Sequence, residues 1–554
     1  MKQLTLIVAL LLCSVVSLAQ EQGTFFGGFE SNSQWLQQDD DLFTFDPGAT
    51  FLPEDQFRAN NYFQLNYTYG KFTAGVQYEL YLPSALLGYS PVFDGNNGIA
   101  TYFLNFKNET LDITGGYFYE QFGSGLLLRS WEDRQLGVNT AMRGVRVKWT
   151  PYDYWDVTAL VGQQRDGFNV SEGVVTALDS NLDIANVAQL ENIDLRFGAS
   201  YVNRYQDRGS NEVIPSNVSA YGARLDFGVG NFFGGVEAGM KDEDAIAAEG
   251  ELVSNRLYDG TALLVNLGYS QKGLGINSTF RRLENFAFYS DRLAEGNQFN
   301  QQLINYTPGL TKQQDYLLTN IYVYNPQPRL LTDNLEQRVG EVGTQTDIYY
   351  TFPKESFLGK YRTKVAFNFS YWGGLDASFN EDLSYDVEFI GSGDRYFRDV
   401  NFEIKNRWSS KFSSVLTFQN VITDKGVVLG GPLGQQGDIK ATVAVAEGTI
   451  KFNNGQSLRL VGQHLWTEQD RKDWAGFVTE FNFNSRLSVY VADAWNYGGE
   501  GELHYYNVGG SYSKGRTRLG LNYGRQRGGL ICVGGVCRFV PANNGLSINL
   551  SVNF

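Results

Sequence analysis

The chain has 554 residues, 45 of them Lys or Arg against 60 Asp or Glu, which gives a formal net charge of −15. Aromatic residues make up 15% and charged residues 19%, a composition that excludes a disordered chain, and the acidic balance argues against a nucleic-acid partner. Two histidines leave little room for histidine-based metal binding or catalysis. No change of composition marks a linker, so we expect one large architecture.

Residues 1–19 have the features of a secretory signal peptide that is removed by cleavage. Lys2 supplies a positive charge, residues 4–16 are apolar, and Ser17 and Ala19 form the small-x-small pattern that precedes a cleavage site. No later apolar run approaches the roughly 20 residues that a membrane-spanning helix requires. The exported chain is therefore either a soluble β-protein or an outer-membrane β-barrel.

The period of the sequence favours the barrel. In residues 72–82, Phe72, Val76 and Leu80 share one face of an extended strand, whereas Thr73 and Glu79 lie on the other. Strands of soluble sandwiches usually run for about 5 or 6 residues. The clearest alternating runs in this chain extend for about 10 to 13 residues, which suits the roughly 9 to 11 tilted residues that cross a bilayer.

The number and spacing of these segments predict the architecture. Tight links such as 70–71, 453–455 and 514–515 alternate with mostly longer, acidic or Gly-rich connections, as periplasmic turns and extracellular loops do. About 24 segments qualify, within a range of roughly 22 to 26, and the two that begin near Gly173 and Ile193 are the weakest. We therefore predict an all-β fold, a single transmembrane antiparallel β-barrel over residues 20–554, with short periplasmic turns and long extracellular loops.

The C-terminal segment indicates where such a barrel would lie. Leu546, Ile548 and Leu550 point one way and alternate with polar residues, and the chain ends on the aromatic Phe554. This resembles the closing strand of outer-membrane proteins, whose terminal Phe is read by the barrel-assembly machinery. We expect Phe554 to be that signal and the protein to lie in the outer membrane of a Gram-negative bacterium, in contact with lipid and lipopolysaccharide. An edge strand of a soluble domain is the alternative.

Two segments are candidates for filling the lumen. Residues 288–340 form the longest interval without a clean strand, and the alternatives are that it folds into the lumen or caps the outside. The second segment contains Arg129, Glu132, Asp133 and Arg134, whose mixed charges predict an ion-pair network inside the lumen. A solvated outer loop is an equally weighted interpretation of this second segment.

Four motifs carry a resemblance to a known family. They are residues 29–35 (FESNSQW), the segment 119–134, residues 306–308 (YTP) with 311–313 (TKQ), and residues 532–538 (CVGGVCR). Together they resemble an uncharacterised family of large outer-membrane barrels from Bacteroidota-type bacteria, over essentially the whole mature chain. The resemblance implies location and fold only, because the family has no established activity, and it supplies no functional residue.

The two cysteines of the mature chain flank a short Val-Gly-Gly-Val segment. Because exported proteins fold in an oxidising environment, we predict a disulfide between Cys532 and Cys537. A metal site would need further ligands, and none lie nearby in sequence. A free thiol pair for redox chemistry is the weaker alternative. We therefore expect neither a metal nor a cofactor.

The catalytic alternative depends on the histidines. Alternation places His464 with Leu460 and His504 with Val508 on lipid-facing sides, near the outer rim. Both therefore fit an interfacial girdle, and we expect no catalytic residue and no enzyme. A rim site built from carboxylates stays open as the low alternative. The acidic run of Asp39, Asp40 and Asp41 is interpreted as a solvated loop, with a weak cation site as the minority view.

Three function classes remain. We favour a passive or gated channel for solutes, because the expected barrel is wide and its inward residues are polar. The second class is a structural or scaffold subunit of an outer-membrane assembly, secretion or surface complex, with protein partners and a plugged lumen. The third, a barrel for an apolar ligand, would need an inward apolar patch that the strands do not obviously show. A first strand near Thr24 leaves no room for the plug domain of an energised receptor, so that class is disfavoured.

Overall fold

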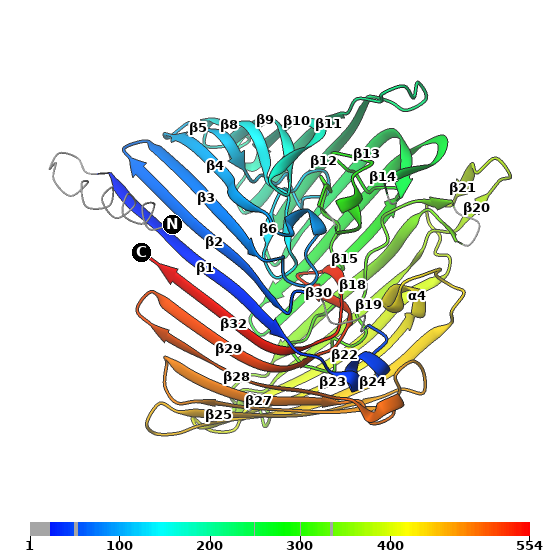
Figure 1. Ribbon diagram of the computed structural model, residues 1–554. Coiled ribbons are helices and arrows are strands. Elements are labelled where there is room, and N and C mark those ends of the chain that lie inside the picture. The colour runs from blue at the N-terminus through cyan, green and yellow to red at the C-terminus, as the bar shows by residue number, and fades with distance from the viewer. Residues whose placement is uncertain (1–22, 49–53, 249, 300, 333–335) are drawn as a thin grey trace.

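The computed structural model describes residues 23–48, 54–248, 250–299, 301–332 and 336–554; the predicted signal peptide, 1–19, lies outside them. Twenty-four strands form one antiparallel sheet that closes on itself (Figure 1). Closure occurs at strand β1 (Thr24–Leu36), which pairs with β2 (Phe57–Tyr69) on one side and with β32 (Asn543–Asn553) on the other. The predicted all-β barrel of about 24 strands is confirmed.

The other wall strands follow one another around the barrel in chain order. They are β3 (Phe72–Leu82), β4 (Asn97–Lys107), β5 (Leu111–Phe118), β8 (Met142–Tyr152), β9 (Trp155–Asp166), β10 (Asn169–Asp183), β11 (Ile193–Tyr205), β12 (Asn217–Val229), β13 (Phe232–Ala248), β14 (Glu251–Gln271), β15 (Leu274–Glu284), β18 (Gly340–Thr351), β19 (Lys364–Gly374), β22 (Arg395–Arg407), β23 (Phe412–Asp424), β24 (Asp438–Lys451), β25 (Ser457–Trp466), β26 (Trp474–Asn482), β27 (Leu487–Trp495), β28 (His504–Lys514) and β29 (Thr517–Gln526).

Alternation of side chains along each strand explains how the wall forms. On β10, Leu178 is 47% exposed on the outer surface, whereas the next residue, Asp179, is buried on the lumen side. The same period places Leu460 outside and Val461 inside on β25. None of the helices in the described residues is long and apolar enough to cross a membrane.

The two rims of the barrel differ. The rim that holds both termini, here called the turn rim, carries short links such as 70–71, 230–231 and 515–516, with a longer connection at 352–363. The opposite rim, the loop rim, carries mostly long connections, although β9 and β10 are joined by residues 167–168 alone. The turn rim also carries a longer connection at 184–192, and on the loop rim β14 begins only three residues after β13 ends. The predicted division into turns and loops therefore holds for most connections, with two exceptions on each rim.

The alternating pattern predicts a strand that begins near Gly260, but β14 begins at Glu251, and this is the largest error in strand placement. Strands β13 and β14 are 17 and 21 residues long, and their pairing shifts register between Lys241 and Asp244 and again between Ala245 and Ala247. Each shift breaks the alternation of side chains. The alternating sequence pattern of β13 and β14 therefore stops before the end of their hairpin.

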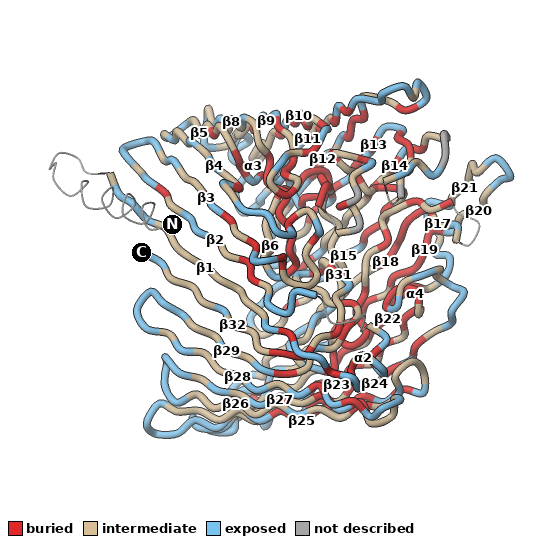
Figure 2. The backbone as a smooth tube through the Cα atoms, viewed as in Figure 1, coloured by how far each residue is buried: buried red, intermediate tan, exposed pale blue. Residues whose placement is uncertain are grey.

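Three loops of the loop rim fold inward, and they are called the plug here: residues 119–141, 285–339 and 527–542, as far as they are described. They contain the short strand pairs β6 (Glu132–Asp133) with β7 (Val138–Asn139), β16 (Leu331–Thr332) with β17 (Gln337–Arg338), and β30 (Gly529–Val533) with β31 (Val536–Val540). Figure 2 shows buried chain gathered in the barrel interior and along β18 and β19, whereas β28, β29 and β32 are mainly intermediate or exposed.

Candidate functional site

The first plug loop is sealed against the wall by apolar side chains. Leu127 belongs to a buried cluster that includes Leu160 and Val202 of the wall and Phe286 of the long loop. Gly239 of β13 gives room for this contact, because a Cβ atom there would lie 2.8 Å from the Phe286 ring and 3.1 Å from Leu127. Burial of apolar surface therefore holds this part of the plug.

A second apolar seal lies on another part of the wall. Leu318 of the long loop is buried in a cluster with Val443, Val461 and Trp474. Tyr324 stacks on Trp372 of β19, with ring centroids 5.5 Å apart and an angle of 15° between the planes. The expectation that the strands present no apolar patch to the lumen is therefore wrong. The sequence does not distinguish these inward Val and Ala residues, because the outward face of the same strands is apolar as well.

A buried ion pair anchors the long loop between these two seals. Arg281 of β15 and Glu341 of β18 lie 2.5 Å apart and are almost completely buried. The Arg281 guanidinium also donates to the carbonyl of Pro308, at 2.6 Å. The Glu341 carboxylate accepts hydrogen bonds from the Tyr324 hydroxyl at 2.5 Å and from the backbone N–H of Gln327 at 2.6 Å. Each charge therefore has a wall partner and a plug partner.

The third loop is a hairpin closed by a disulfide. Cys532 and Cys537 are bonded, which confirms the predicted bridge. The hairpin tip touches the long loop, because Tyr306 donates from its hydroxyl to the Gly534 carbonyl at 2.9 Å and the N–H of Gly309 donates to the Gly535 carbonyl at 2.6 Å. The tip turns through positive φ angles of 58° and 83°, which glycine adopts without strain.

Arg538 joins the hairpin to two other loops. Its guanidinium donates to the carbonyl of Gly88, in the loop between β3 and β4, and to the carbonyl of Phe299 in the long loop. Burial lowers the pKa of Arg538 to about 10. The side chain thus ties three loops together with carbonyl partners.

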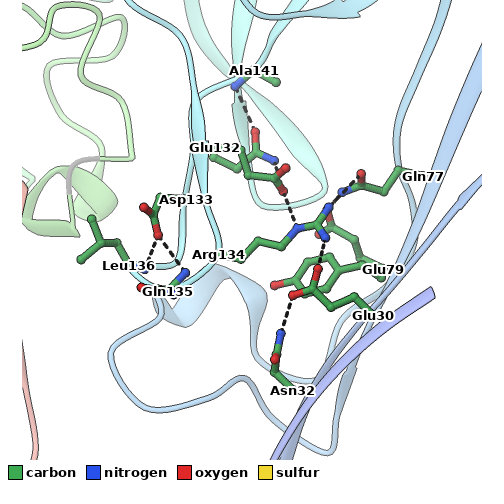
Figure 3. A network of polar contacts seen from close by, with 12 residues as sticks. Glu30, Asn32, Gln77, Glu79, Glu132, Asp133, Arg134, Gln135, Leu136 and Ala141 are labelled. Carbon is green, nitrogen blue, oxygen red and sulfur yellow. Dashed lines mark hydrogen bonds and ion pairs between the residues drawn. The ribbon is translucent and has the colours of Figure 1, made fainter. Parts of the chain in front are cut away.

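The predicted ion-pair network is centred on Arg134 (Figure 3). Its guanidinium lies 2.5 Å from the carboxylate of Glu30 on β1 and 3.3 Å from that of Glu132, and donates to Gln77 at 3.4 Å. Burial acts to lower the pKa of Arg134, but Glu132 and Glu30 raise it above its usual value. The network therefore fixes the first plug loop to the barrel wall at β1 and β3.

The other two residues predicted for this network have different contacts. Arg129 lies over the Tyr306 ring, 3.8 Å from its centroid, and over Trp131 at 5.1 Å. Asp133 accepts hydrogen bonds from the backbone N–H groups of Gln135 and Leu136. Neither forms an ion pair within the described residues, so the network as predicted is too broad. A cation–π stack and a turn cap satisfy these charges locally.

A cavity of about 740 Å³ separates the plug from the wall at the closure of the barrel. We call it the seam cavity. On the wall side it is lined mainly by uncharged polar or small residues of β1, β29 and β32, namely Asn32, Ser33, Gln34, Gly520, Asn522, Ser547, Asn549 and Ser551. On the opposite side it is lined by Leu86 and Leu87, from the loop between β3 and β4, and by Ile531 and Val540 of the plug. Glu30 and Arg134 also line the cavity, and their ion pair neutralises both charges.

The seam cavity extends along most of the strand length. Its lining begins at Arg518 and Ser551, close to the turn rim, and reaches Gln526 and Asn543 at the loop rim. The closure itself is regular, since the N–H of Phe554 donates to the carbonyl of Gly27 at 3.0 Å and the N–H of Gly27 donates to the carbonyl of Phe554 at 3.2 Å. The Phe554 ring, 47% exposed, packs beside Phe63 on the outer surface.

The histidines and the acidic run lie apart from the lumen. Nε2 of His464 is 2.9 Å from the Tyr497 hydroxyl, and Nδ1 of His504 is 2.6 Å from the Asp493 carboxylate, both near the loop rim. Asp39 accepts hydrogen bonds from Arg525 at 2.6 and 2.7 Å. Asp41 lies 3.6 Å from the same guanidinium, whereas Asp40 accepts from Gln38. No group of three or more His, Cys, Asp or Glu residues in the described chain is arranged to hold a metal.

Comparison with solved structures shows that the fold is shared with other outer-membrane barrels. The PapC usher in an E. coli P pilus tip assembly intermediate is similar with a TM-score of 0.50 and 8% identity, over 97% of this chain and 62% of that one. A structure of the PapC translocation pore gives a TM-score of 0.42 and 8% identity, over 96% and 99%. The siderophore receptor PirA from Pseudomonas aeruginosa gives 0.41 and 9%, over 97% and 81%.

At these identities the likeness establishes the fold and nothing about activity. A comparison with curated proteins finds no match. A family of unknown function, DUF6029, matches residues 1–554, and the chain therefore belongs to that family.

Proposed function

We propose that the protein is a gated outer-membrane channel that passes small polar solutes through the seam cavity. The observation that carries the proposal is the extent of that cavity, which follows β29 and β32 from the turn rim to the loop rim. At two other parts of the wall the plug packs through apolar clusters, which exclude water and solutes there. The cavity is the route along which a solute meets polar groups throughout.

The lining favours small polar solutes without a strong net charge. Amide and hydroxyl groups such as Asn522, Ser547 and Asn549 donate and accept hydrogen bonds, and the charges of Glu30 and Arg134 cancel. Arg518 near the turn rim and Arg527 of the plug add two further positive charges, so the lining favours neutral or weakly anionic solutes over cations. A volume of about 740 Å³ lies in the range of about 300 to 1,000 Å³ that is common for small-molecule sites.

The proposal places the turn rim in the periplasm and the loop rim outside, as in other barrels of this type. We further propose that the protein comes from a Bacteroidota-type bacterium. The barrel-assembly machinery recognises Phe554, and lipopolysaccharide surrounds the outer surface of the wall. The proposal assigns no catalysis. The gate is formed by the plug loops, because they narrow the seam cavity from the lumen side.

A pair of cysteine variants tests the route. Ser547 lines the seam cavity, whereas the next residue, Ile548, alternates to the outer face of β32. S547C and I548C each add one thiol to a mature chain whose two cysteines are already bonded. Treatment with a charged, water-soluble thiol reagent should reduce single-channel conductance of S547C by at least about half and leave I548C unchanged. Equal responses, or no conductance in the unmodified protein, would contradict the proposal.

A scaffold role is the second candidate, supported by one exposed apolar site. In the loop between β19 and β22, beyond the hairpin of β20 (Ala377–Phe379) and β21 (Tyr385–Val387), Phe389 is 63% and Ile390 89% exposed. Exposed apolar pairs of this kind favour protein partners. Crosslinking from position 390 in whole cells, with loss of the product in F389S/I390S, would support a scaffold.

A further inference from the structure

A second cavity, of about 260 Å³, lies where the loop-rim end of β13 meets the long plug loop. Its charged lining residues are Lys241 and Asp244 from β13, and Arg292 and Arg329 from the plug. Three cations therefore face one anion across this space. Arg204 of β11, which is fully buried, approaches the same carboxylate and adds a fourth cation to the cluster.

The single carboxylate in the lining is already paired. Arg204 lies 2.8 Å from one Asp244 oxygen and Arg292 lies 3.5 Å from the other. Two further carboxylates act on the cluster from outside the lining. Asp291 accepts a hydrogen bond from Gln206 at 2.7 Å, and Asp259 is exposed on β14. Neither lines the cavity, and neither forms an ion pair with Lys241 or Arg329 among the described residues.

The other hydrogen bonds of these cations go to carbonyl groups, and Arg329 also lies over the Tyr289 ring, 5.1 Å from its centroid. Lys241 is 5% exposed, and its ammonium donates to the carbonyl of Ala287 at 3.0 Å. Arg329 donates to the Asn297 carbonyl at 3.3 Å. Arg292 is 6% exposed and donates to Pro215 at 2.7 Å, and its Nε atom has no hydrogen-bond partner.

Excess positive charge in a buried space is costly unless an anion compensates it. Burial, and then repulsion from Arg204, lowers the pKa of Arg292 to about 10. This shift is consistent with an excess of positive charge around the cavity. Lys241, Arg292 and Arg329 line the space together; Arg292 Nε has no hydrogen-bond partner, and one bond to Ala287 leaves the Lys241 ammonium with further N–H groups to donate. A tetrahedral oxyanion with two negative charges matches this set of donors better than chloride, because it accepts several charge-assisted hydrogen bonds at once.

We propose that this cavity binds a soluble oxyanion of the phosphate type, held by Lys241, Arg292 and Arg329. The ligand is a soluble one because Lys241 points to the lumen side of the wall, so that β13 and β14 lie between the cavity and the bilayer. The cavity opens among the loops of the loop rim, on a different part of the wall from the seam cavity. The inference therefore goes beyond solute passage and does not depend on it.

The test uses the intact protein in detergent free of lipopolysaccharide, with inorganic phosphate as the probe. At constant ionic strength we expect saturable binding of one phosphate per chain by isothermal titration calorimetry, and a rise in Tm with phosphate concentration. Chloride at the same ionic strength should not raise Tm. Binding without saturation, or of many phosphates per chain, would overturn the proposal.

Variants separate a built site from a general charge effect. K241M and R292M should each weaken phosphate binding by at least about tenfold. K241M should not lower Tm in the absence of phosphate, because it removes a buried charge that has no carboxylate partner. R459M is the matched control, since Arg459 also faces the lumen but is paired with Glu447 at 2.9 Å. Equal phosphate binding by K241M, R292M and the wild type would overturn the proposal, as would equal loss in R459M.

Discussion

The plug meets the wall in two ways, and the contrast between them suggests how the barrel is both filled and open. Around Leu127 and Leu318 the contact is apolar and excludes water. At the seam the wall presents Asn522, Ser547 and Asn549, and a cavity remains. The same strand period produces both arrangements, because only the inward residues differ. The chemistry of the inward face thus decides which part of the wall holds the plug and which part leaves a cavity.

The polar anchors of the plug follow the same division. Between the apolar seals, Arg281 and Glu341 are buried, and each forms hydrogen bonds with the long loop. At the seam, the side chains of Arg134 and Glu30 are 25% and 33% exposed. Because exposure weakens an ion pair, the first anchor should dominate the stability of the plug and the second should influence passage.

The largest expected effect comes from cutting the buried anchor. E341Q leaves Arg281 buried without a counter-charge, which costs about 3 to 5 kcal/mol. We expect the long loop to loosen, so that single-channel conductance rises and Tm falls. The matched variant E30Q removes the seam ion pair, which is worth about 0 to 1 kcal/mol. It should leave Tm nearly unchanged and shift the ion selectivity of the passage toward anions.

If E30Q lowered Tm more than E341Q does, the proposed difference between the buried ion pair and the seam ion pair would be wrong. Equal changes in Tm would show that the two ion pairs contribute equally to the stability of the protein. No change in conductance for E341Q would show that the long loop does not depend on the Arg281–Glu341 pair.

A smaller effect is expected from the hairpin that borders the seam cavity. Ile531 and Val540 of β30 and β31 line that cavity, and the disulfide holds the two strands together. C532S/C537S should cost the hairpin about 2 kcal/mol, the loop-closure value for so short a ring. The passage should then fluctuate more, which single-channel current noise measures with and without reductant. Unchanged single-channel current noise would show that the disulfide does not influence the passage.

The smallest effect concerns an exposed hairpin outside the lumen. Hydrogen bonds from the Ser384 hydroxyl and backbone N–H, and from Arg256, lower the pKa of Asp382 from 3.8 to about 2. Because the folded pKa is depressed, the stabilisation is present above pH 3.8 and is lost as the pH falls through about 2. Amide hydrogen exchange in residues 377–387 should accelerate over that range, while exchange at the plug seals stays slow. If hydrogen exchange accelerated over the same pH range in residues 377–387 and at the plug seals, Asp382 would not be acting on the hairpin alone.

The strand architecture could be predicted because alternation is a local signal. The runs around Phe72 and Leu546 carry it clearly, and the strand count of 24 follows from such runs. Where bulges interrupt the alternation, as after Lys241 in β13, the predicted boundary is displaced. The disulfide was also accessible, because Cys532 and Cys537 are close in sequence and are the two cysteines of the predicted mature chain.

The plug contacts could not be predicted, because they join residues that are far apart in the chain. Arg281 and Glu341 are separated by 60 residues, and Arg134 pairs with Glu30 across 104. Local charge at 129–134 correctly drew attention to Arg134 but could not show that Arg129 stacks on Tyr306 instead. The seam cavity likewise depends on which strands become neighbours at closure, where β1 meets β32.

The central claim is that the plug blocks passage through the lumen except along the seam, and planar-bilayer conductance tests it most directly. The intact protein should be compared with a variant in which a short Gly-Ser link replaces residues 291–337, after both are refolded and shown to be β-rich. We predict a small, steady conductance for the intact protein and a conductance at least several times larger for the deletion. Equal conductances would contradict the plug, and a silent intact protein beside a conducting deletion would contradict the seam passage.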